Sequence, residues 1–219
     1  MAIIPRRNLL VHMHPAKDSC AWLVVIDRLK KHWLQFTGKK VCAIVYGPNL
    51  FTPETVKARM PADTEFVVMR NNPQLREAAT WMALLDKVRS VEPNEYSFYC
   101  HSKGTATASV ETSGIVYWRN YMFSQLLNNQ PTIDEMLKTH PFVGTLREDA
   151  AHNEEYLHPD GPISTHGWRF PGTFFWFQHA SFFSNELSAV KPTSAWDVER
   201  LPGNMFPAEL WSNVGVRGI

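Results

Sequence analysis

Short apolar runs alternate with helical patterns along the first half of the chain, and this alternation restricts the fold more than any other feature. Apolar and β-branched residues predict strands at residues 8–13, 41–47, 65–69 and 96–100. Between the strands, residues 16–36 and 73–88 carry apolar side chains at the helical period, and Thr52-Pro53-Glu54 marks the start of a further helix. This order predicts an α/β fold with a mostly parallel, doubly wound sheet flanked by helices.

Ligands of such sheets bind beyond the carboxyl ends of the strands, near the point where the strand order reverses. We therefore expect ligand contacts from the loops that follow the four strands, at residues 14–19, 46–49, 70–72 and 101–105.

The second half of the chain has a different character. Residues 114–127 predict a helix, residues 133–137 begin another, and an aromatic strand is expected at 173–177. The remaining expectations are a short strand at 142–146, a helix at 179–188 and irregular structure at 193–211, where two prolines stand. Residues 150–170 hold His152, His158 and His166 with few apolar residues, and a loop of that length is often functional.

Composition excludes several classes of protein. The 219 residues include 22 Lys and Arg against 21 Asp and Glu, a net charge of +1 that gives a nucleic-acid partner no particular support. No apolar run approaches the roughly 20 residues that span a bilayer. Three cysteines without a CxxC pair indicate reduced thiols and a cytoplasmic location rather than a disulfide framework or a zinc site.

The segment from Cys100 to Gly104 is the strongest candidate for an active centre. His101 and Lys103 alternate with Ser102 after a buried type of strand, so in extended geometry both would point the same way. Gly104 allows a sharp turn or a close approach to a ligand, and two cationic groups beside it suit a phosphate or diphosphate. The alternative is a solvated turn with Lys103 simply exposed.

Two further strand ends carry polar residues. Asn71 and Asn72 precede Pro73 at a strand-to-helix junction, where a helix N-terminus attracts anions, although either asparagine can serve only as a cap. His12 and His14 alternate on the first strand, but no third ligand of suitable spacing is visible, which favours ordinary histidines over a metal site.

Candidates on the other side of the site come from the second half. Asp197 and Glu199 alternate near Pro202-Gly203, and either carboxylate is a candidate general base, with a surface ion pair between Glu199 and Arg200 or another cation as the alternative. Trp168, within the long loop, is the best aromatic side chain to stack on a sugar ring or a base.

The order of these elements resembles that of a known family, the nucleotide-diphospho-sugar glycosyltransferases of the GT-A fold. In that fold an Asn-containing strand-helix junction precedes an apolar strand that ends in Asp-x-Asp. Residues 98–104 (FYCHSKG) look like the His-Ser/Thr-Lys-Gly element of a glycosyltransferase-like group. The other segments that carry the resemblance are YWRNYM at 117–122, GTFFW at 172–176 and ERLPG at 199–203.

The resemblance implies a Rossmann-like GT-A fold in one domain over residues 1–219. Residues 1–104 would form the nucleotide-binding half and residues 105–219 the acceptor-side half. The residues expected to hold the nucleotide and its diphosphate are His14, Pro15, Tyr46, Asn71, Asn72, His101, Ser102, Lys103 and Gly104. Those expected on the acceptor side are Trp118, Trp168 and His166.

The chain departs from the GT-A pattern at its metal site. Where Asp-x-Asp would bind a divalent cation, this sequence has His101-Ser102-Lys103. A carboxylate pair recruits such a cation, whereas His101 and Lys103 would repel it and could neutralise the diphosphate themselves. The sequence therefore predicts a transferase that needs no divalent metal and no other cofactor, with Asp197 or Glu199 as the base if the reaction inverts.

The function expected from the sequence is transfer of a sugar from a nucleotide-diphosphate sugar to a carbohydrate or other hydroxyl acceptor. Hydroxymethylated DNA bases are a conceivable acceptor. The alternative is a non-catalytic module that binds nucleotide sugar or carbohydrate and has lost the metal site. A nucleotide-dependent dehydrogenase ranks last, because Met13-His14-Pro15-Ala16-Lys17 stands where GxGxxG would follow the first strand.

Overall fold

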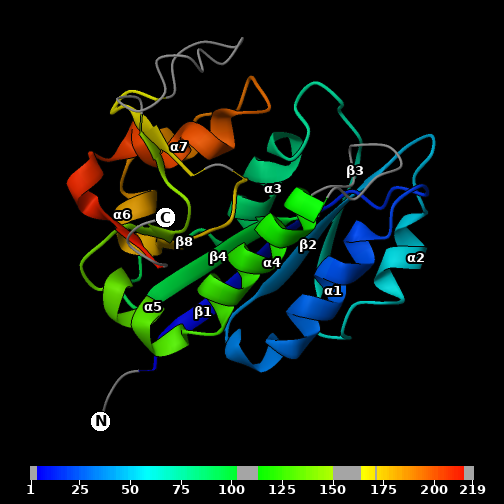
Figure 1. The fold of residues 1–219 in the computed structure, drawn as a ribbon, viewed down its shortest axis with the longest axis horizontal. Coiled ribbons are helices and arrows are strands. Elements are labelled where there is room, and N and C mark those ends of the chain that lie inside the picture. The colour runs from blue at the N-terminus through cyan, green and yellow to red at the C-terminus, as the bar shows by residue number, and fades with distance from the viewer. Residues whose placement is uncertain (1–3, 103–112, 150–163, 171, 215–219) are drawn as a thin grey trace.

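The computed structural model describes residues 4–102, 113–149, 164–170 and 172–214. Within them, seven strands form one sheet in the order β3-β2-β1-β4-β8-β5-β9, and β6 pairs with β7 in a separate ribbon. All neighbouring pairs in the large sheet are parallel except the two that involve β8. The expected α/β class with a mostly parallel sheet flanked by helices is therefore confirmed (Figure 1).

The strands of the large sheet come from both halves of the chain. They are β1 (Arg6–Met13), β2 (Lys40–Tyr46), β3 (Glu65–Arg70), β4 (Glu95–His101), β5 (Phe142–Gly144), β8 (Phe175–Gln178) and β9 (Trp211–Asn213). The ribbon consists of β6 (Glu148–Asp149) and β7 (Trp168–Arg169). The helices are α1 (Ala21–Lys31), α2 (Pro53–Lys57), α3 (Ala78–Val88), α4 (Ser113–Leu127), α5 (Gln130–Leu137), α6 (His179–Phe183) and α7 (Asp197–Met205).

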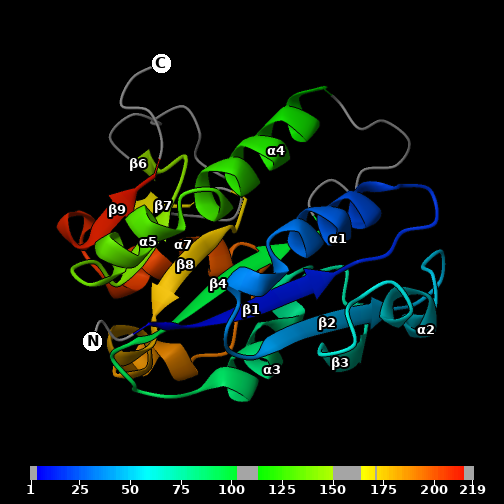
Figure 2. The ribbon, with the colours of Figure 1, turned by 90° about the horizontal axis from the view of Figure 1, so that it is seen from below.

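Two apolar layers cover the sheet, one on each face. Successive residues of β1 alternate between them: Leu9 and Val11 belong to the layer under α1 and α4, and Leu10 to the layer under α3 and α7. Figure 2 shows α1 and α4 above the sheet and α3 below it. A strand covered on both faces requires a near-continuous apolar run, which is why β1, β2 and β4 could be read from the sequence.

Three of the expected elements differ from the structure at their bounds. Two helices begin later than expected, and one helix forms where irregular structure was expected. The first helix begins at Ala21 rather than residue 16, and α3 begins at Ala78 rather than Pro73. The third error is larger, because residues 197–205 form helix α7 instead of irregular structure. Asp197 in its first turn accepts hydrogen bonds from the backbone N–H groups of Thr193 and Ser194, which fastens the preceding turn to the start of the helix, and Pro202 stands inside the helix.

Candidate functional site

The strand order reverses between β1 and β4. From β1 the chain builds β2 and β3 on one side, and then crosses to add β4 on the other. Open α/β sheets bind ligands at such a switch point, outside the carboxyl ends of the two strands. His12 of β1 and His101 of β4 are neighbours in the register at this edge. The site described below is built around them.

The predicted nucleotide loops meet at this edge of the sheet. Ser102 joins the first and fourth strands, since its N–H donates to the His12 carbonyl (3.0 Å) and its Oγ accepts from the His14 N–H (2.8 Å). The Phe51 N–H donates to the Pro15 carbonyl at 2.8 Å and so ties the first loop to the second.

The third loop joins the same edge. The Asn71 N–H donates to the carbonyl of Tyr46 at 2.8 Å. The structure therefore brings His14, Pro15, Tyr46, Asn71 and Ser102 into one row, and the ring of Tyr46 is 44% exposed.

Asn72 has a structural role in this row. Its Oδ1 accepts from the N–H groups of Gln74 (3.0 Å) and Leu75 (3.2 Å), which closes an Asx-type turn rather than capping a helix, because α3 begins only at Ala78. The turn that it starts continues to Arg76, whose φ of 50° is uncommon for a residue with a side chain.

His12 is a neutral hydrogen-bond donor inside the protein. Its Nδ1 lies 2.9 Å from Thr80 Oγ1, and that hydroxyl in turn donates to the carbonyl of Glu77. Burial lowers the pKa of His12 to about 3, and the attraction of Glu77 offsets this only in part. His12 is therefore uncharged at neutral pH and connects the end of β1 to the first turn of α3.

His101 points into the protein rather than into open solvent. Only 8% of it is exposed, and its Nε2 lies 2.8 Å from the carbonyl oxygen of Gly172. A carbonyl oxygen only accepts, so this nitrogen carries the proton and donates. The expectation that His101 turns toward a bound diphosphate has to be revised: in this structure it anchors the turn at Gly172 and Thr173.

That turn is strained. Gly172 has a φ of 89° and Thr173 a φ of 56°, and a β-branched residue in the left-handed region is an outlier. Such strain persists only where the surroundings enforce it, and it is often found at functional sites. Here the turn is fixed by His101 on one side and by the carboxylate of Glu199, which accepts from the Gly172 N–H at 2.8 Å, on the other.

Two carboxylates converge on the hydroxyl of Thr173. Its Oγ1 lies 3.3 Å from Glu77 Oε1 and 3.4 Å from Glu199 Oε1, and the side chain is fully buried. A hydroxyl has one proton to donate, so the two carboxylates share a single donor. Glu199 has a further partner in Arg169, whose guanidinium lies 3.6 Å from Oε2.

Asp197 and Glu199 do not act as a pair. Both lie on α7, and residues two apart on a helix do not face each other. The oxygens of Asp197 accept from the backbone and the hydroxyl groups of Thr193 and Ser194. Burial alone would raise the pKa of Asp197, but these hydrogen bonds outweigh it and lower the pKa. Asp197 therefore fastens the turn before α7 to the start of the helix and is a weak base, which leaves Glu199 as the stronger of the two predicted alternatives.

The predicted acceptor-side residues are not brought together. Trp168 is fully buried, its Nε1–H donates to the Phe206 carbonyl (2.9 Å), and its ring packs at 5.3 Å from that of Phe170. The prediction that its face is open to a sugar is therefore wrong. His166 is exposed and Trp118 is half-buried on α4. Lys103, Gly104, His152 and His158 lie outside the described residues.

Sequence reasoning missed Glu77 and Thr173 as members of the site. Glu77 precedes α3 and was passed over because the helix was expected to begin at Pro73. The available signal was its place just after a strand-to-helix junction at the carboxyl edge of the sheet. Thr173 had no signal of this kind, because its importance comes from a backbone conformation.

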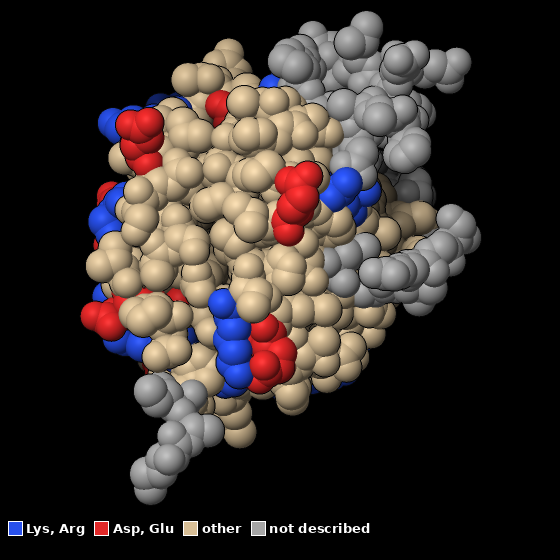
Figure 3. Space-filling view, turned by 90° about the vertical axis from the view of Figure 1, so that its left-hand side faces the viewer, with Lys and Arg blue, Asp and Glu red and all other residues tan. Residues whose placement is uncertain are grey.

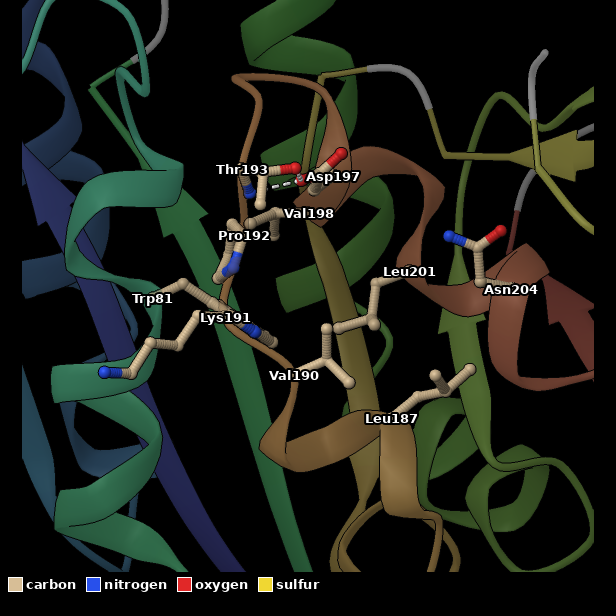
Figure 4. Close-up of a pocket in the computed structure, with 10 residues that line it drawn as sticks. All are labelled: Trp81, Leu187, Val190, Lys191, Pro192, Thr193, Asp197, Val198, Leu201 and Asn204. Carbon is tan, nitrogen blue, oxygen red and sulfur yellow. Dashed lines mark hydrogen bonds between the residues drawn. The ribbon is translucent and has the colours of Figure 1, made fainter. Parts of the chain in front are cut away.

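A small pocket lies on the same side of the sheet as α3 and α7. Its volume is about 250 Å³, below the usual range for drug-sized ligands. The residues that line it are Trp81, Leu187, Val190, Lys191, Pro192, Thr193, Asp197, Val198, Leu201 and Asn204 (Figure 4). The carboxylate of Asp197, which is among these residues, is turned toward Thr193 and accepts the hydrogen bond from its N–H.

Charge is spread evenly over the face of the molecule that carries α6 and α7. Figure 3 shows acidic and basic side chains scattered among other residues there, and the described residues form no extended basic patch on this face. Across the described parts of the chain, no three His, Cys, Asp or Glu side chains are placed to hold a metal ion. Nor is any helix in those parts both apolar and long enough to cross a bilayer.

No protein-family model and no curated protein sequence matches the chain. Among solved structures, 4-diphosphocytidyl-2C-methyl-D-erythritol synthase is similar with a TM-score of 0.45 and 10% identity, over 98% of this chain and 92% of that one. Core-mannan synthase A from Aspergillus fumigatus, in its Mn/GDP form, is similar with a TM-score of 0.43 and 11% identity, over 94% and 72% of the two chains. Because both scores and both identities are low, the function proposed below rests on the geometry of the site.

Proposed function

We propose that this chain is a transferase that acts on a nucleotide-linked sugar and moves the sugar to a carbohydrate or another hydroxyl acceptor. One observation carries the proposal. At the switch point of a doubly wound sheet, buried and half-buried polar groups from β4, the start of α3 and α7 converge on one strained turn. Such a turn is retained at a cost in stability, and enzyme sites are where such costs are commonly found.

The nucleotide is assigned to the row of joined loops at the carboxyl edge. The Tyr46 ring, the backbone around Asn71, and the His14–Ser102 connection form a continuous border there. The diphosphate is assigned next to Ser102, toward Lys103 and Gly104, where a lysine ammonium can compensate its charge. His101 acts as a positioning residue, because its hydrogen bond to Gly172 holds the turn beside this border.

The reaction breaks the bond between the anomeric carbon and the diphosphate oxygen, and forms a bond from that carbon to the acceptor oxygen. The leaving diphosphate takes the electron pair of the broken bond, so a fixed positive charge near it lowers the barrier. The acceptor hydroxyl gives its proton to a carboxylate. Glu199 is retained as the candidate base in this proposal, and Asp197 is not, because its oxygens accept hydrogen bonds from Thr193 and Ser194.

Calorimetry with UDP, GDP and CDP, followed by turnover of the corresponding nucleotide sugars in EDTA, tests the proposal. We expect one nucleotide to bind, and turnover to persist in the chelator. Lys103→Ala should reduce turnover at least tenfold, while Lys57→Ala, on the distant helix α2, should leave it unchanged.

Three results would count against parts of this assignment. Loss of turnover in EDTA would refute metal independence. An unaffected Lys103→Ala would refute the diphosphate role. Nucleotide binding without any transfer or hydrolysis would instead favour the non-catalytic binding module.

A further inference from the structure

We infer that Glu77 binds the sugar of the nucleotide-sugar donor by accepting hydrogen bonds from its hydroxyl groups, and so distinguishes the sugar-bearing donor from the bare nucleotide. The inference rests on the proposed function. It assigns a role to a residue that the sequence had not singled out, and it places the sugar on the α3 side of the strained turn.

The position of Glu77 is fixed from three directions. Its carbonyl accepts from the Thr80 hydroxyl, which itself accepts from His12 of β1. Its carboxylate accepts from the hydroxyl of Thr173. A carboxylate just before the first turn of the 11-residue helix α3 is also stabilised by the helix dipole. A group held in this way presents its oxygens in a defined direction.

Burial separates Glu77 from Glu199. Glu199 is only 4% exposed, and its two oxygens already contact the Gly172 N–H and the Arg169 guanidinium. Glu77 is half-buried, so part of its side chain remains accessible from solvent. Of the two carboxylates at the turn, Glu77 is therefore the more accessible to a ligand.

A buried hydroxyl nearby supports a ligand at this point. Tyr99 of β4 is fully buried, and its hydroxyl has no hydrogen-bond partner among the described residues. Burial, followed by the charge of Glu77, raises the pKa of Tyr99, which places the phenol within the field of that carboxylate. Buried polar groups in native proteins generally have partners, so this one indicates a place that a ligand or water completes.

The charges of the groups around the strained turn determine which part of the donor can bind there. His12 is neutral, His101 donates to a carbonyl group, and Glu77 brings a carboxylate. A diphosphate would be repelled by the carboxylate, whereas neutral hydroxyl groups donate to it readily. A nucleotide sugar offers such neutral donors on its transferred sugar as well as on its nucleoside, and only those of the transferred sugar are missing from the bare nucleoside diphosphate.

Binding of a nucleotide sugar and of its bare nucleoside diphosphate to the full chain, measured by calorimetry, tests the inference. Glu77→Gln should weaken nucleotide-sugar binding at least tenfold and change nucleoside-diphosphate binding less than twofold. Glu77→Asp, which keeps the charge, should recover part of the loss. Glu54→Gln is the matched control, because Glu54 is another glutamate at the start of a helix, in the first turn of α2.

Two results would overturn the inference: equal weakening of both ligands, or no weakening by Glu77→Gln. If Glu77→Gln does not fold, Glu77→Asp must still shift nucleotide-sugar binding and spare the nucleoside diphosphate. Failure of the proposed function has a different signature, since the unmodified chain itself would then bind neither ligand.

Discussion

Acidification should lower the unfolding free energy of this protein because it favours protonation of His179, which is fully buried at the amino ends of β1 and β4. Its Nδ1 lies 2.9 Å from the hydroxyl of Ser90, which donates to Glu95, so Nδ1 carries the proton. Its Nε2 then accepts from the Ser97 hydroxyl at 2.7 Å. The neutral ring fits this network, and a second proton would break the hydrogen bond from Ser97.

The pKa of His179 gives the size of the effect. Burial lowers it from 6.5 to about 4, against a weaker opposite influence of Glu95. The unfolded chain therefore binds the proton first, and stability falls as the pH drops from about 6.5 toward 4. Between pH 7 and pH 5 this histidine costs about 2 kcal/mol of unfolding free energy. His12, with a pKa of about 3, adds about 2 kcal/mol over the same interval.

Urea unfolding at pH 7 and at pH 5 measures the loss, on the unmodified chain and on His179→Gln. The variant should be less stable at pH 7, because Gln cannot reproduce both hydrogen bonds of the ring. Its loss between the two pH values should be about 2 kcal/mol smaller than that of the unmodified chain. His166→Gln, at an exposed position, should behave like the unmodified chain. An equal pH dependence in His179→Gln would refute the reasoning.

Three other substitutions test the packing. A Cβ on Gly203 would lie 1.9 Å from the backbone oxygen of Trp168, so Gly203→Ala should cost about 2 kcal/mol or more in urea unfolding. Gly114→Ala, with nothing within 4 Å of the added atom, should instead stabilise by about 0.5 kcal/mol, and similar losses in both variants would contradict the steric argument. Tyr99→Phe removes a hydroxyl without a described partner, so thermal unfolding should show no loss, or a gain of up to about 1 kcal/mol. A clear loss of stability would mean that the hydroxyl is paired within the folded chain.

The core of the site was partly predictable. His101, Ser102, His14 and Asn71 were identified from topology, because parallel strands place their carboxyl ends at one edge. What each side chain does there was not predictable. His101 was expected to face a diphosphate, and it donates to Gly172, a residue 71 positions later.

The errors share a physical cause. Trp168 was expected on an open loop, yet it is fully buried, because residues 164–169 fold back onto α7. Asp197 and Glu199 were expected in irregular structure, and the helix α7 that forms there separates the directions of their side chains. Local pattern alone does not report such contacts between distant segments.

The sequence by itself determined the alternation of strands and helices, the two-sided burial of β1, β2 and β4, and the edge of the sheet where polar residues gather. These follow from apolar periodicity and from the geometry of parallel strands, which are local or nearly so. Only the tertiary structure decided that Glu77, Thr173 and Glu199 meet. Their meeting depends on where α3 begins, on the left-handed backbone conformation of Thr173, and on how α7 packs. Each of these results from long-range packing rather than from the preference of any residue for its own conformation.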